Sequence, residues 1–124
     1  MSYSHLNRYK KAASFAAVND ATVVDINDAA SLVFAVHSVN TASGITLVLE
    51  GQISDDGPWV GMSFQASNAT AVGTWITVTP AISTLPTNAW HARVAGYGRV
   101  RIRTSARTGG SVVLATSLSD KPIL

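Results

Sequence analysis

Hydrophobic and polar residues alternate along most of this chain with a period of two. The clearest case is the stretch 99–103, where Val100 and Ile102 separate three arginines. Because a β-strand points successive side chains to opposite faces, this alternation predicts a strand with one apolar face and one positively charged face. Residues 31–39 and 45–51 show the same period. The pattern therefore predicts half-buried strands of an antiparallel sheet.

Similar short segments recur along the chain, and turn-forming residues separate them. No window of about 11 or more residues keeps the 3.6-residue period of a helix. Turns are expected at Asn19-Asp20, Asn27-Asp28, Asp55-Asp56-Gly57, Gly96-Tyr97-Gly98 and Gly109-Gly110. The expected strands lie in residues 11–18, 22–26, 31–39, 45–51, 58–64, 75–79, 89–104 and 111–118.

This arrangement predicts an all-β fold, an antiparallel β-sandwich. Long connections between some strands favour jelly-roll or Greek-key wiring over a simple meander. Residues 1–11 are polar and are expected to form a flexible N-terminal arm. Residues 12–124 are expected to form a single β-sandwich domain, which is long enough to bury a core.

The composition narrows the possible classes of protein. Charged residues make up 13% of the chain, against about 25% in typical soluble domains, so part of the surface is expected to be buried in an oligomer or an assembly. The absence of cysteine excludes disulfides and thiolate sites. No apolar run approaches the ~20 residues that span a membrane. Tyr9-Lys10-Lys11 and the apolar stretch after it only faintly resemble a secretion signal, so we expect synthesis and folding in the cytoplasm.

Catalytic and metal-binding patterns are weak. The three histidines fall in separate segments, without the spacing of a metal site: His5, His37 and His91. Four aspartates in two regions would form a calcium site only if their loops converged, and a role in turns is the favoured interpretation: Asp25, Asp28, Asp55 and Asp56. Glu50 lies within an expected strand but has no obvious second acid. The sequence therefore predicts a protein that is not an enzyme and that has no cofactor or metal.

The sharpest feature is the row formed by Arg99, Arg101 and Arg103, with Arg93 and Arg107 nearby. It is consistent with a solvated face, with pairing to acids of a neighbouring subunit, or with contacts to nucleic-acid phosphates. Surfaces that bind nucleic acid usually interleave aromatic residues for base stacking, and here only aliphatic residues alternate. The net charge of +2 also gives little support to a nucleic-acid partner.

Two further groups of residues are candidates for contacts. Trp59, Trp75 and Trp90 either line a sugar-binding surface or fill the core or an interface. The cations of the expected arm can order on a partner surface. The candidate interface residues are therefore Arg8, Lys10, Lys11, Trp90, Arg99, Arg101 and Arg103.

Two stretches of the chain resemble a known group of proteins. Residues 46–62 contain an alternating strand followed by Ser54-Asp55-Asp56-Gly57-Pro58-Trp59. Residues 90–118 contain an aromatic strand, a glycine turn, Arg99-Val100-Arg101-Ile102-Arg103, a Thr-Gly-Gly turn and a closing strand. Both are similar to small virion proteins of tailed bacteriophages that have a jelly-roll or β-sandwich fold.

The resemblance implies a structural protein of a phage particle and brings no catalytic residues with it. The first expectation is a capsid decoration (cement) protein on the surface of the virion, which binds the major capsid protein and stabilises the head from outside. A homo-oligomer, for example a trimer, is expected, with no membrane contact. The alternatives are a tail, baseplate or head-fibre component, or a carbohydrate-binding adhesin module.

Overall fold

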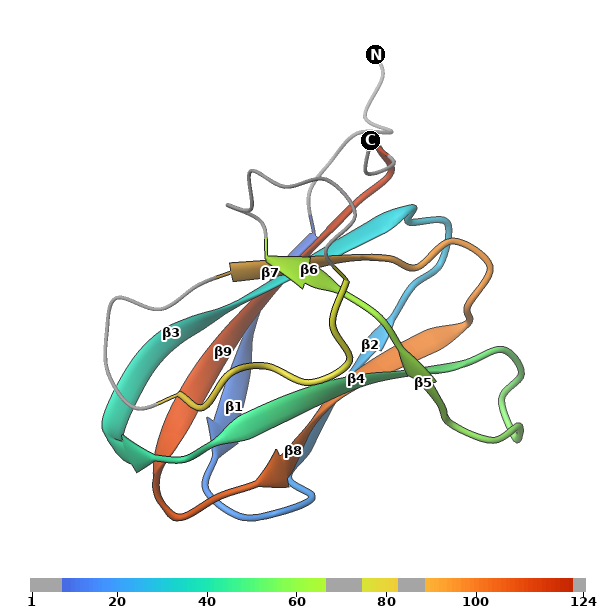
Figure 1. The fold of residues 1–124 in the computed structure, drawn as a ribbon. Helices are drawn as coiled ribbons and strands as arrows, with labels where there is room; N and C mark the ends of the chain where they lie inside the picture. Colours follow the sequence, from blue (N-terminus) through green and yellow to red (C-terminus); the bar gives the residue numbers. More distant parts are fainter. Residues whose placement is uncertain (1–7, 67–74, 83–88, 122–124) are drawn as a thin grey trace.

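Two antiparallel β-sheets pack face to face in the computed structural model of the chain (Figure 1). The structure describes residues 8–66, 75–82 and 89–121. Within these residues one sheet has five strands in the order β1-β9-β3-β7-β6, and the other has four in the order β2-β8-β4-β5. The strands are β1 Arg8–Phe15, β2 Ala21–Asp25, β3 Ser31–Ser43, β4 Thr46–Gln52, β5 Val60–Met62, β6 Gln65–Ala66, β7 Ala89–Arg93, β8 Arg99–Ala106 and β9 Gly109–Ser119. The predicted all-β, two-sheet fold is confirmed.

The core lies between the sheets and is formed by the side chains on one face of each alternating strand. In β8, Val100 and Ile102 are fully buried, whereas the arginines on either side of them are half-buried on the outer face. Phe34 of β3 lies at the centre, with its ring 5.3 Å from that of Phe64 and 5.4 Å from that of Trp90. Burying each such side chain contributes about 1.5–3 kcal/mol relative to exposing it. The period of two therefore determines which residues form the core.

Gly110 allows β9 to approach the far end of β3. Its φ is 71°, and a Cβ at this position would overlap the carbonyl group of Thr41. The register between β3 and β9 shifts between Asn40 and Ser43, so the extra residues form an irregularity there. The expected turn at Gly109-Gly110 therefore lies at the start of β9, where only glycine fits the second position.

The first strand begins earlier than expected. β1 starts at Arg8 and pairs with β9, with Arg8 opposite Leu118 and Lys11 opposite Ala115. Residues 8–11, which the sequence assigned to the arm, thus contribute backbone to the five-stranded sheet. The remainder of the expected arm, residues 1–7, lies outside the described residues.

Three expected strands differ in the structure. The expected strand 89–104 is divided at Gly96-Tyr97-Gly98 into β7 of the five-stranded sheet and β8 of the four-stranded sheet. The expected strand 58–64 is divided, because the chain leaves the four-stranded sheet after β5 and joins the five-stranded sheet as β6. The expected strand 75–79 is wrong. Ile76 forms an isolated bridge with Phe64 (N···O distances of 2.8 and 2.9 Å), and Thr79 donates its backbone N–H to Leu47 of β4 at 3.0 Å. A segment that passes from one partner to another cannot build a continuous ladder with either.

Candidate functional site

The three arginines of β8 share the outer face of the four-stranded sheet. β8 lies between β2 and β4, so its outward side chains are flanked on both sides. Residues that meet them are Glu50 and Gln52 of β4, together with Trp59 from the segment before β5. We call this set the arginine face: Glu50, Gln52, Trp59, Arg99, Arg101 and Arg103. The sequence predicted the shared face of the arginines correctly.

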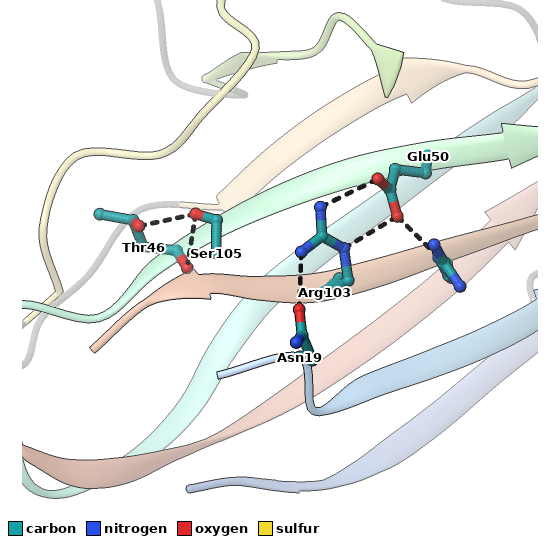
Figure 2. A network of polar contacts seen from close by, with 6 residues as sticks. Asn19, Thr46, Glu50, Arg103 and Ser105 are labelled. Carbon is teal, nitrogen blue, oxygen red and sulfur yellow. Dashed lines mark hydrogen bonds and ion pairs between the residues drawn. The ribbon is translucent and has the colours of Figure 1, made fainter. Parts of the chain in front are cut away.

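Glu50 is the hub of the arginine face (Figure 2). Arg101 donates from Nε to Glu50 Oε1 at 2.6 Å. Arg103 donates from Nε to Oε1 and from Nη2 to Oε2, both at 3.0 Å, and its Nη1 reaches Asn19 Oδ1 at 3.0 Å. The hydrogen bonds from Arg103 lower the pKa of Glu50 against the opposing effect of burial, and Arg101 adds to the lowering. The sequence suggested no partner for Glu50, and the structure supplies two arginines.

Arg99 joins the arginine face to the turn between β4 and β5. Its Nε donates to Gln52 Oε1 at 3.0 Å, and its Nη2 donates to the same oxygen and, at 3.3 Å, to the carbonyl of Asp55. Gln52 in turn donates from Nε2 to the carbonyl of Gly57 at 2.8 Å. These contacts fix the guanidinium and the loop relative to each other.

Trp59 covers part of the arginine row. The Cζ atom of Arg101 lies 4.4 Å from the centre of the indole ring, and that of Arg99 lies 5.6 Å from it, both within the range of cation–π attraction. Along β8 itself only aliphatic residues alternate with the arginines, so the strand pattern alone gave no aromatic neighbour. The aromatic residue comes from another segment, and the only local signal for it was its place just after the Asp55-Asp56-Gly57 turn.

The charge of this face is largely compensated within the chain. Glu50 forms ion pairs with Arg101 and Arg103. Asp25 of β2 lies directly opposite Arg99 in the register between β2 and β8. Side chains opposite each other on neighbouring strands share a face. Two carboxylates therefore share a face with three guanidiniums, and of the two only Glu50 forms ion pairs there, with Arg101 and Arg103.

The N-terminal candidates lie on the other sheet. Arg8, Lys10 and Lys11 belong to β1, which pairs with β9 at an edge of the five-stranded sheet. Their side chains lie outside the described part of the structure. The structure therefore does not bring these residues into one strand ladder with the arginine row.

Trp90 is a core residue, so its assignment to the candidate interface is wrong. Its exposed fraction is 2%, and it packs on Phe34 from the inner face of β7. The three tryptophans also do not share one surface, since Trp59 lies on the arginine face and Trp75 contacts Arg93 at 5.0 Å. A buried indole contributes packing and is not available to a partner or a sugar.

The aspartates and the described histidines do not gather into one cluster. His91 shares a hydrogen bond of 2.9 Å with Gln65, and His37 is exposed on β3, while His5 lies outside the described residues. Across residues 8–66, 75–82 and 89–121, no cluster of three or more His, Cys, Asp or Glu side chains is placed to hold a metal ion. The same ranges contain no helix with the length and apolar character needed to cross a membrane.

The fold matches that of a protein of prophage origin. The structural neighbour is described as the "Crystal structure of SPBc2 prophage-derived protein YomS". The two structures align with a TM-score of 0.67 over 96% of this chain and 98% of that one, at 12% sequence identity. No protein-family model matches this sequence, and no curated protein matches it either. At this identity the likeness establishes a shared two-sheet β fold.

Proposed function

We propose that this chain is a non-enzymatic structural protein of a phage particle, and specifically a decoration protein that binds the major capsid protein on the outside of the head. The observation that carries the proposal is the fold match with a prophage-derived protein over nearly the whole of both chains. A match of this extent makes the single sandwich domain the common unit of the two proteins.

The strand order supports jelly-roll wiring. Strands β1, β9, β3 and β7 form a row in one sheet, and β2, β8, β4 and β5 form a row in the other. The chain alternates between the sheets from β1 to β4, and again from β7 to β9. Apart from the two-residue β6 at the edge of the five-stranded sheet, this leaves four strands in each sheet, connected in the nested way that is typical of jelly rolls, which also occur in viral capsid proteins.

The arginine face is the surface that we assign to the contact with the capsid. Arginine and tryptophan are enriched in protein interfaces and among the residues that contribute most to binding. The contacts of Arg99 and Arg101 with Trp59 fix their side chains in advance, so little rotamer freedom is lost on binding. Glu50 and Asp25 reduce the positive charge of the same face and so weaken its attraction for nucleic-acid phosphates, which favours a protein partner.

Assembly into a homo-oligomer, such as a trimer, fits the small share of charged residues. Many copies on one particle would add avidity without a tight single contact. In this proposal the protein is made in the host cytoplasm, needs no cofactor, does not enter a membrane and ends on the surface of the virion.

The first experiment measures the number of copies of this chain per purified virion by quantitative mass spectrometry, with the major capsid protein as the standard. A ratio near one to one supports a decoration protein on the head lattice. A handful of copies would reject that role in favour of the tail, the baseplate or a head fibre. Absence from the particle would reject a virion role altogether.

A second experiment tests the assigned surface. Trp59→Ala and Arg99→Ala should each weaken binding to undecorated capsids by about tenfold, the effect of losing ~1.4 kcal/mol of contact. Arg107→Ala, which changes an exposed arginine in the β8–β9 turn, is the matched control and should bind as the wild type does. Equal binding by all three variants would move the contact to another face.

A further inference from the structure

A hollow of about 320 Å³ is lined by residues of β5, the end of β7 and the segments next to them, and none of the three arginines of β8 belongs to its lining. Its lining combines two aromatic rings, a thioether, a guanidinium and a hydroxyl group from Met62, Ser63, Trp75, Arg93 and Tyr97. Gly61 contributes to the same lining, and its missing side chain leaves open space beside it. The volume is at the lower end of the ~300–1,000 Å³ that is typical of small-molecule sites.

The wall formed by Tyr97 is fixed by packing and by backbone hydrogen bonds. The phenol ring lies so close to Gly51 that a Cβ there would overlap both the ring and the Met62 sulfur. The backbone N–H of Tyr97 donates to the carbonyl of Val94 at 3.1 Å, and the N–H of Gly98 donates to Gln52 at 2.9 Å. This wall of the hollow is therefore formed before any ligand arrives, which limits the ordering cost of binding.

Arg93 brings a positive charge to this hollow that no acidic side chain of the described structure neutralises. All seven acidic residues of the sequence lie within the described ranges, and the ion pairs found there join Glu50 to Arg101 and Arg103. The Arg93 guanidinium instead lies over Trp75, with 5.0 Å between Cζ and the ring centre. An exposed guanidinium of this kind is suited to an external carboxylate or phosphate, which it binds with two parallel hydrogen bonds.

We propose that this hollow binds a saccharide that carries an acidic group. The rings of Trp75 and Tyr97 offer apolar surface to the C–H groups of a sugar, and the hydroxyls of Ser63 and Tyr97 match its hydroxyl groups. Arg93 binds the acid. Among the described residues, the lining has no Asn, Gln, Asp or Glu side chain to recognise the edge of a nucleobase, so a saccharide fits these residues better than a nucleotide.

This site goes beyond the structural role proposed above and does not depend on it. On a particle with many copies, weak individual sites of this kind would act together through avidity. The isolated protein tests the site, whereas the copy number per virion tests the structural role, so the two proposals can fail separately.

The test uses nuclear magnetic resonance of the ¹⁵N-labelled full chain, in which each tryptophan gives its own indole signal. The probes are a galacturonate trisaccharide, its uncharged methyl ester and glucose 6-phosphate, so that carboxylate, neutral sugar and phosphate are compared. We expect the indole signal of Trp75 to move with a dissociation constant of about 1 mM for at least one acidic probe. The acidic probe that moves the Trp75 signal more shows whether the site prefers a carboxylate or a phosphate.

Variants distinguish specific recognition of the acidic group from non-specific binding of the probes. Arg93→Gln should weaken binding of the acidic probe by about tenfold, the effect of one charge-assisted contact worth ~1.4 kcal/mol, and should leave binding of the methyl ester unchanged. Trp75→Ala should weaken binding of both. Arg107→Gln is the matched arginine control and should leave all titrations unchanged.

Three results would overturn the proposal. One is a Trp75 signal that stays in place at about 10 mM of every probe. Another is an affinity for the methyl ester equal to that for each of the two acidic probes, since Arg93 would then have no role. The third is a response confined to Trp59, which would assign the binding to the arginine face.

Discussion

Glu50 and Arg103 form a two-point ion pair between neighbouring strands, although 53 residues separate them in the sequence. The register places Glu50 opposite Arg101, so its contact with Arg103 runs diagonally across β4 and β8. Both oxygens of the carboxylate are used, and Arg101 adds a third hydrogen bond at 2.6 Å. One acidic residue thus orders two arginines of a half-buried surface.

Replacing Glu50 by Gln should destabilise the protein, because two guanidiniums lose their carboxylate while remaining side by side. The expected loss is about 1–2 kcal/mol, since the Glu50 side chain is only 15% exposed but both arginines keep access to water. Urea denaturation measures the change. Asp56→Asn, in the exposed β4–β5 turn, is the control and should change the free energy of unfolding very little. Equal values for the two variants would show that the ion pair contributes nothing to stability.

The stability of the protein should depend on pH through Glu50. Its pKa in the folded state lies below the ordinary value of 4.5, chiefly because Arg103 donates hydrogen bonds to the carboxylate. A group whose pKa is lowered by folding stabilises the protein above its unfolded-state pKa, and that contribution is lost as the pH falls through the folded-state value. The difference in unfolding free energy between wild type and Glu50→Gln should therefore be full above pH 4.5 and shrink below it. A difference that does not change on acidification would contradict this assignment.

Trp90 and Trp59 should differ sharply in their effect on stability. Trp90→Ala removes a ring that is 2% exposed and packed on Phe34, so a loss of about 3–5 kcal/mol is expected. Trp59→Ala removes a half-exposed ring from the arginine face and should cost about 1 kcal/mol, chiefly through lost cation–π contacts. Chemical denaturation of both variants measures these losses. Similar losses would contradict the placement of Trp90 in the core.

The adjacent glycines of β9 provide a matched pair. Gly110→Ala forces a Cβ into the Thr41 carbonyl at a φ of 71°, and we expect a loss above about 1 kcal/mol. At Gly109 a Cβ would meet nothing within 4 Å, so Gly109→Ala should be neutral or slightly stabilising. Thermal unfolding of the two variants compares them directly. The opposite order would show that β9 does not approach β3 as described.

The sequence predicted most strands, and the apolar face of strands such as β8, for a local reason. Alternation along β8 separated Val100 and Ile102 from the arginines without any knowledge of the neighbouring strands. The same reasoning failed where the partner changes along a segment. Ile76 and Thr79 look like part of one strand, yet they pair with Phe64 and Leu47 on different elements. Trp90 was assigned to an interface because its residue type is common there, and only the sheet pairing shows that it points inward.

The sequence by itself determined that the chain forms alternating strands, which side of a strand such as β8 faces the core and that three arginines share an outer face. These properties follow from the period of two, which is a local consequence of strand geometry. Only the tertiary structure decided that Glu50 orders two of those arginines, that Trp59 covers the row and that Arg93 meets Trp75 beside a hollow. Such contacts join distant segments, and they depend on strand order and register, which local periodicity leaves open.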